Sequence, residues 1–88
     1  MKHDFKGFII NIQLNSAKTF FIQGVFSHFV VCDHPGGWII ELHFKDSALS
    51  VAHLVDARNH EERVFKSIDA ALKTAREIGF SFYRLTSC

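Results

Sequence analysis

The chain of 88 residues is poor in cysteine and proline and has no long apolar run. Its two cysteines, Cys32 and Cys88, are too few for the disulfide framework of a small secreted domain. We therefore expect free thiols and a cytoplasmic protein. Residues 1–6 fit this expectation because they lack the apolar core of a secretory signal. Polar residues interrupt every apolar stretch, so none reaches the roughly 18 residues of a membrane span, and we expect no membrane partner.

An excess of charge of one sign is also missing, because the formal net charge is +1. Proteins that depend on phosphate contacts usually show a basic excess, and the overall count shows none. What the chain does have is apolar surface: 48% of its residues are hydrophobic and ten are Phe. For a domain of this size, that much apolar surface predicts either a very aromatic core or burial against a partner.

Alternating apolar and polar residues predict strands along much of the chain. The alternation is found in the ranges 5–14, 38–44, 48–58, 62–66 and 80–86. Residues 19–33 are rich in β-branched and aromatic side chains, and Gly24 is the expected place for a bulge or bend in that strand. Pro35 and Gly36 suit the central positions of a type II turn, which predicts a hairpin between 19–33 and 38–44.

One helix is predicted over residues 67–78. Ser67 can accept a hydrogen bond from the first turn as an N-cap, and Gly79 can adopt the positive φ that ends many helices. Between them, apolar side chains recur at helical spacing at Ile68, Ala71, Leu72, Ala75 and Ile78.

These elements predict a single α+β domain over residues 1–88. Its sheet should have five to six strands, mainly antiparallel, in the order β-β-β-β-β-α-β, with the one C-terminal helix on one face. The expected core contacts of that helix are Leu72 and Ile78, beside Phe65 and either Phe8 or Ile10.

The 19–33 strand is apolar on both faces, which predicts a homodimer or a larger assembly. A helix of about 12 residues spans about 18 Å and covers one face of a sheet, so the other face would be left in water. The predicted subunit interface consists of Phe21, Val25, Phe29, Val31 and Ile39. The alternative is a sheet that bends at Gly24, closes on itself and buries the same residues internally.

The side chains that could carry chemistry form no recognisable catalytic motif. His28, Cys32 and His34 are of types that zinc accepts, but His28 and Cys32 would lie about 13 Å apart along a strand. No glycine-rich phosphate loop, carboxylate pair or nucleophile–base signature accompanies them. The sequence therefore predicts a protein that is not an enzyme, with no catalytic residues, no metal site and no cofactor.

Two histidines allow a further interpretation. His43 and His53 are placed to face each other across adjacent strands, where a pair of imidazoles could respond to pH near 6.5. The alternative is that both are half-exposed strand residues without a role of their own.

Aromatic side chains on an open sheet face could stack single-stranded bases, with basic residues following the nucleic-acid backbone. The predicted backbone contacts are Lys18, Lys45, Arg58, Arg63, Lys66 and Arg84, with Arg76 as a further basic residue around the same face. The competing interpretation places the same Phe side chains in the core and in a subunit interface.

Residues 54–80 resemble the strand–turn–strand–helix segment of small bacterial plasmid replication proteins of the RepB-like group. The matching residues are Leu54, Ala57, Arg58, Arg63, Phe65, Lys66, Ser67, Asp69, Ala70, Ala71 and Glu77 to Gly79. The resemblance implies a bacterial protein with a role near plasmid or other mobile DNA, and it assigns no catalytic or base-reading residue. We therefore expect a nonenzymatic DNA-associated protein. The alternative is a homo-oligomeric binding or structural module with no nucleic-acid role.

Overall fold

The computed structural model describes residues 9–46 and 51–81. In chain order its elements are β1 (Ile10–Ile12), α1 (Leu14–Ile22), β2 (Phe26–His34), β3 (Gly37–Phe44), β4 (Ala52–Leu54) and α2 (Ile68–Ile78). The four strands form one sheet in the order β1-β4-β3-β2. β2, β3 and β4 pair antiparallel, whereas β1 pairs parallel with β4.

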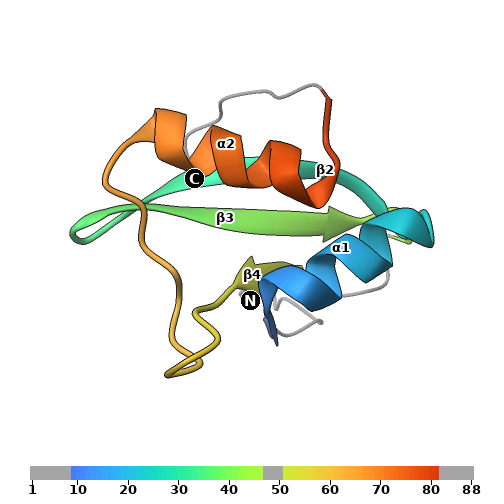
Figure 1. Cartoon of the computed structure of the whole chain (residues 1–88), viewed down its shortest axis with the longest axis horizontal. Helices are drawn as coiled ribbons and strands as arrows, with labels where there is room; N and C mark the ends of the chain where they lie inside the picture. The colour runs from blue at the N-terminus through green and yellow to red at the C-terminus, as the bar shows by residue number, and fades with distance from the viewer. Residues whose placement is uncertain (1–8, 47–50, 82–88) are drawn as a thin grey trace, which may run out of the picture.

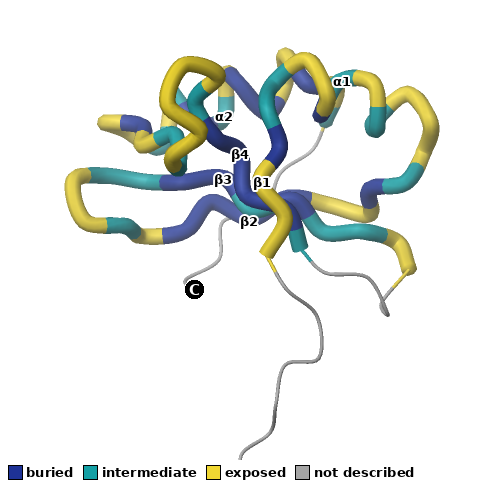
Figure 2. Tube along the Cα trace, turned by 90° about the horizontal axis from the view of Figure 1, so that it is seen from below, coloured by how far each residue is buried: buried dark blue, intermediate teal, exposed yellow. Residues whose placement is uncertain are grey.

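Both helices lie on the same face of this sheet (Figures 1 and 2). The α+β class is therefore confirmed. The detailed topology is not, because the described residues form four strands in a mixed sheet and a second helix.

Helix α1 occupies residues for which alternation predicted a turn and the start of a strand. Leu14, Ala17 and Phe21 recur at a spacing of three and four residues, so they share one side of a helix. Ala17 is fully buried there, and Leu14 and Phe21 pack against the core. Burial of this apolar side outweighs the strand preference of the β-branched and aromatic residues. Gly24, with φ of 77°, lies in the turn after the helix instead of forming a bulge within a strand.

The predicted hairpin is confirmed as β2 and β3, which turn at Pro35 and Gly36. Its irregularity lies between Phe26 and His28. Gly37 approaches the chain closely, because a Cβ at this position would overlap the carbonyl oxygen of Phe65. Glycine is therefore required where the residues before α2 cross the end of the hairpin.

The predicted C-terminal helix is confirmed as α2. The Ser67 hydroxyl accepts a hydrogen bond from the Ala70 N–H at 3.1 Å, and Gly79 follows the last turn with φ of 140°. Ile78 is buried in the core as expected, and Phe65 is buried beside it in the same cluster. Leu72, also predicted to sit in the core, is only partly buried and packs against that cluster.

Residues 55–66, called here the connecting segment, differ from the strands predicted over 48–58 and 62–66. Strand β4 has only three residues, and the connecting segment makes isolated bridges at Val55–Glu62 and Trp38–Phe65. The predicted last strand over 80–86 falls largely outside the described residues, as does the predicted core position Phe8. Phe80 and Ser81, at its start, are not in a strand. The alternative to Phe8, Ile10, is 37% exposed, so the prediction that Ile10 lies in the core is wrong.

The residues predicted to form a subunit interface are covered within a single chain. Phe29 and Val31 are 3% and 2% exposed in the core beneath the helices, and Phe21 and Val25 pack against that core. Ile39 is buried on the opposite face, beside Val30 and Cys32. The prediction that this patch would be left in water is therefore wrong: the helices cover Phe29 and Val31, and Ile39 is buried on the other face. The sheet does not need to close on itself to bury them. That the chain assembles into a homodimer or larger oligomer stays a prediction.

Cys32 is buried and disulfide-bonded. The expectation of a free thiol at this position is therefore wrong. No helix within the two described stretches is long and apolar enough to cross a membrane.

Candidate functional site

The face of the sheet opposite the two helices, called here the helix-free face, carries a chain of histidine and glutamate side chains. On β3, Ile40 and Leu42 are fully buried in the helix-side core. Because side chains alternate along a strand, Glu41 and His43 lie on the helix-free face. His53 of β4 pairs with Glu41 in the sheet register and is the best buried residue of this group, with a side chain 8% exposed.

His53 lies between two carboxylates. Its Nε2 donates to Glu41 Oε2 at 3.0 Å, and its Nδ1 donates to Glu62 Oε2 at 2.5 Å. An ionised carboxylate can only accept hydrogen bonds, so both ring nitrogens of His53 must carry protons. The geometry therefore makes His53 an imidazolium cation that joins β4 to β3 and to the connecting segment.

Each carboxylate uses its second oxygen for another histidine. Glu41 Oε1 accepts from His43 Nε2 at 2.8 Å, and Glu62 Oε1 accepts from His34 Nε2 at 2.8 Å. The result is a continuous line, His43–Glu41–His53–Glu62–His34, which spans β2, β3, β4 and the connecting segment. We call this line the histidine–glutamate chain. At its β3 end the ring of His43 stacks on the ring of His28, with centroids 4.5 Å apart.

The hydrogen bonds among His53, Glu41 and Glu62 shift the pKa values of all three groups. The hydrogen bond to Glu41, assisted by that to Glu62, raises the pKa of His53 above its ordinary 6.5, although burial opposes the shift. The hydrogen bond from His53 lowers the pKa of both Glu41 and Glu62 below their ordinary 4.5. Between about pH 4.5 and 6.5 the centre of the histidine–glutamate chain is therefore one cation held between two anions.

The sequence anticipated part of this arrangement. It placed His43 and His53 on one face of adjacent strands, and the structure joins them through Glu41. The description of both as half-exposed is wrong for His53, which is buried. Glu62 and His34 were missed as partners, because only the folded connecting segment brings Glu62 back to the sheet.

Within residues 9–46 and 51–81, no group of three or more His, Cys, Asp or Glu residues is arranged to hold a metal ion. The zinc interpretation of His28, Cys32 and His34 is ruled out in this structure, because the Cys32 thiol is committed to a disulfide.

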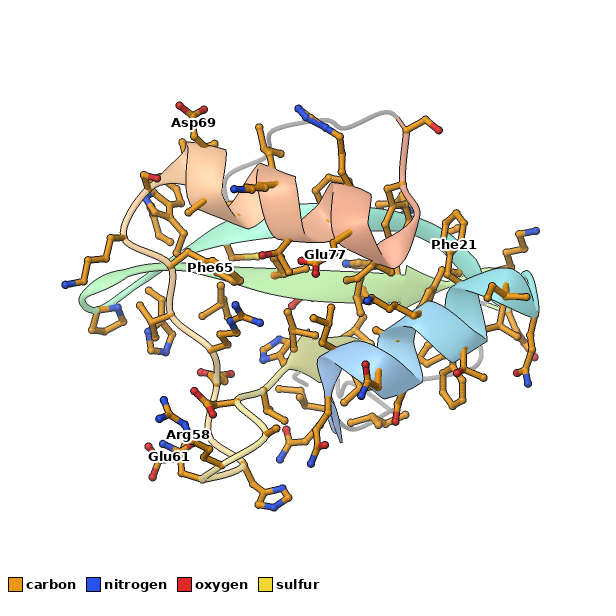
Figure 3. The ribbon with its side chains drawn as sticks, in the orientation of Figure 1. Phe21, Arg58, Glu61, Phe65, Asp69 and Glu77 are labelled. Atoms are coloured by element: carbon orange, nitrogen blue, oxygen red, sulfur yellow. The ribbon has the colours of Figure 1, made fainter. Side chains whose placement is uncertain are left out.

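A cleft of about 620 Å³ lies between the start of α1 and the connecting segment. Arg58, Asn59 and Arg63 line it from the segment, and Gln13 and Asn15 line it from the helix side. The Arg58 side chain is 90% exposed and lies 3.5 Å from the carboxylate of Asp56, so its guanidinium remains open to solvent. Figure 3 shows Arg58 beside Glu61 at the outer tip of the segment.

Of the basic residues predicted to contact nucleic acid, the structure places Arg58 and Arg63 in one site, the cleft. Lys18 is on α1, Lys45 follows β3, Lys66 precedes α2, and Arg76 is in the last turn of α2. None of these four lines the cleft. Arg84 lies outside the described residues.

The predicted aromatic platform is absent from the described surface of the sheet. Phe26 and Phe29 are buried, and Phe80 contacts both rings from the helix side, at centroid distances of 6.3 and 4.9 Å. The described side chains that are large, apolar and exposed are Ile9, Ile10, Ile22 and Val64. The surplus of Phe therefore builds an aromatic core.

Comparison with protein-family models, with curated proteins and with solved structures finds no match to this chain. The resemblance of residues 54–80 to RepB-like plasmid replication proteins therefore stays a prediction.

Proposed function

We propose that this is a nonenzymatic nucleic-acid-associated protein that contacts a phosphate backbone in the cleft between α1 and the connecting segment. The observation that carries the proposal is the presence of Arg58 and Arg63 in one cleft, with the amides of Asn15 and Asn59. Guanidinium groups bind phosphate through paired hydrogen bonds, and amide groups add neutral donors.

The acidic residues of the cleft leave these arginines available for an anion. Glu62 directs its two carboxylate oxygens to His53 and His34, so both oxygens already have hydrogen-bond partners other than the two arginines. Asp56 approaches Arg58 at 3.5 Å, and a contact this exposed is weak and easily displaced. Arg63 lies with its guanidinium carbon 5.1 Å from the ring centre of Phe65, a contact that steadies the side chain without neutralising it.

The described Phe side chains are buried in the core or packed against it, and this changes the expected mode of binding. Stacking of bases on an exposed aromatic face is replaced by contacts to the backbone, which carry little sequence information. Binding should therefore be similar for different sequences and should weaken steeply with salt. The resemblance of residues 54–80 to plasmid replication proteins supports the same class of ligand, and Arg58 and Arg63 are among the matching residues.

Fluorescence anisotropy with labelled single- and double-stranded oligonucleotides at low salt tests the proposal. We expect binding that the double variant Arg58→Ala/Arg63→Ala weakens by at least about tenfold, the scale expected when two phosphate contacts are lost. The matched control is Lys73→Ala/Arg76→Ala, which removes two charges from the exposed side of α2 and should bind nearly as wild type.

Two results would count against the proposal. Absence of binding at tens of micromolar protein would remove nucleic acid as a ligand and leave the homo-oligomeric module as the alternative. Equal losses in the two double variants would show a general charge effect instead of a site in the cleft. Sedimentation of the same samples measures the assembly state directly, with a monomer at 10.1 kDa.

A further inference from the structure

The connecting segment is tied to the sheet at its two ends by backbone hydrogen bonds. The Val55 N–H donates to Ile12 O at 2.9 Å, and Trp38 and Phe65 exchange bonds of 2.9 and 2.7 Å. Figure 3 shows Phe65 where the segment meets β3. Within the segment, the turn closes largely on itself, with the Asp56 N–H donating to Glu61 O at 2.8 Å.

Glu62 is the side chain that joins this turn to the helix-free face. It does so through His53 Nδ1 at 2.5 Å and His34 Nε2 at 2.8 Å. The connection depends on the charge of His53, because its other nitrogen is already committed to Glu41. A neutral imidazole has one N–H and one lone pair, so it can serve one of the two carboxylates and must repel the other.

We propose that the proton on His53 controls how firmly the connecting segment is held against the sheet. When His53 is a cation, the segment and its cleft are ordered; when His53 is neutral, Glu62 leaves and the turn loosens. Glu41 belongs to strand β3, which is paired on both sides. Among the described residues, Glu62 bridges only to Val55 of its own segment, and near it the segment meets the sheet through one backbone bond, from the Arg63 N–H to Leu54 O at 3.0 Å. The inference concerns the segment itself and holds whether or not a nucleic acid binds there.

The other groups around His53 are consistent with this assignment. On the helix-free face, its described surroundings are Glu41 and His43 from β3, His34 from β2, Glu62 from the segment, and the uncharged Asn11, its register partner on β1. His28 stacks on His43. The raised pKa of His53 places the loss of its proton on the alkaline side of 6.5.

Amide hydrogen exchange of the full chain between pH 5.5 and 9 tests the proposal, after correction for the intrinsic pH dependence of exchange. We expect protection at Asp56 and Arg63, whose N–H groups donate to Glu61 O and Leu54 O, to fall as His53 loses its proton. The fall should approach about tenfold for each pH unit by which the His53 pKa is raised. Trp38, the single tryptophan, should report the same transition by fluorescence because it bridges to Phe65.

Variants separate this mechanism from a general effect of pH. In His53→Gln the segment should be poorly protected at both ends of the pH range, with no transition between them. In Glu62→Gln the transition should also be lost, whereas the matched control Glu61→Gln should behave as wild type. Glu61 is the neighbouring carboxylate, and its exposed side chain lies at the tip of the segment (Figure 3).

The proposal is overturned if wild-type protection is constant across the pH range, or if His53→Gln keeps the transition. It is also overturned if far-UV circular dichroism shows the whole domain unfolding together with the segment. Should His53→Gln fail to fold, nitrogen chemical shifts of the His53 ring in the wild type decide the matter. Both nitrogens must be protonated at pH 5.5, and the ring must titrate together with the protection of the segment.

Discussion

The two faces of the sheet are held by different kinds of interaction. On the helix side, side chains such as Leu42 and Leu54 are fully buried beneath α1 and α2. On the helix-free face, the histidine–glutamate chain ties β2, β3, β4 and the connecting segment by charged hydrogen bonds. We therefore expect the contribution of the helix side to stability to be nearly independent of pH, and that of the histidine–glutamate chain to change with pH.

The largest loss of stability is expected from a substitution in the core beneath the helices. Leu42→Ala should lower the free energy of unfolding by about 2–5 kcal/mol, because Leu42 is fully buried and its removal leaves a cavity. In a domain of this size such a loss threatens folding altogether. Urea denaturation measures the change, and Leu72→Ala is the control: its partly buried side chain predicts a clearly smaller loss. Equal losses would mean that α2 packs differently from the structure.

An intermediate effect, with a pH signature, is expected on the helix-free face. Glu41→Gln removes the negative charge and leaves one acceptor oxygen for two histidines, so it should lower the free energy of unfolding by about 1–2 kcal/mol. A raised His53 pKa stabilises the fold fully below pH 6.5, and this stabilisation is lost as pH rises through the raised value. A lowered Glu41 pKa stabilises the fold above pH 4.5, and this is lost as pH falls through the lowered value.

The difference between wild type and Glu41→Gln should therefore be largest between about pH 4.5 and 6.5 and should shrink on both sides. Urea denaturation of both proteins at pH 3, 5.5 and 9 is the measurement. The cost of Leu42→Ala, measured at the same three values, should be nearly constant. If the loss of unfolding free energy in Glu41→Gln is the same at all three pH values, the two faces do not differ in their pH dependence.

The smallest loss of stability is expected at the N-terminus of α2. Ser67→Ala removes the acceptor of the Ala70 N–H and should cost about 1 kcal/mol. The neighbouring exposed substitution Lys66→Ala leaves this N-cap in place and should change stability much less. Thermal unfolding of the two variants at one pH provides the test, and a neutral Ser67→Ala would show that the cap adds nothing to α2.

Local patterns in the sequence were sufficient for the elements that stabilise themselves. The Pro35–Gly36 turn requires only its own residues, and α2 carries its N-cap, apolar stripe and final glycine within 67–79. Helix α1 escaped prediction because Phe20, Phe21 and Ile22 favour a strand locally. The helical conformation is stabilised only when Ala17 and Phe21 pack against the core formed by the rest of the chain.

The candidate site shows the same division. The alternation of side chains along each strand was enough to predict that His43 and His53 share one face, because it depends only on the local sequence. The partners Glu62 and His34 could not be found in this way, because the first lies nine residues beyond His53 and the second on another strand. Likewise the sequence did not distinguish Arg58 and Arg63 from the other basic residues. They share a cleft only because the connecting segment lies against the start of α1.

By itself, then, the sequence determined an α+β class, the β2–β3 hairpin and the capped helix α2, because these follow from interactions between residues close together in the chain. The tertiary structure alone decided that residues 14–22 are helical, that the apolar strand β2 is covered within one chain, and that His53 is held between two carboxylates. Each of these depends on burial or charge supplied by residues distant in sequence. A local sequence pattern does not specify which distant residues will lie in contact with it.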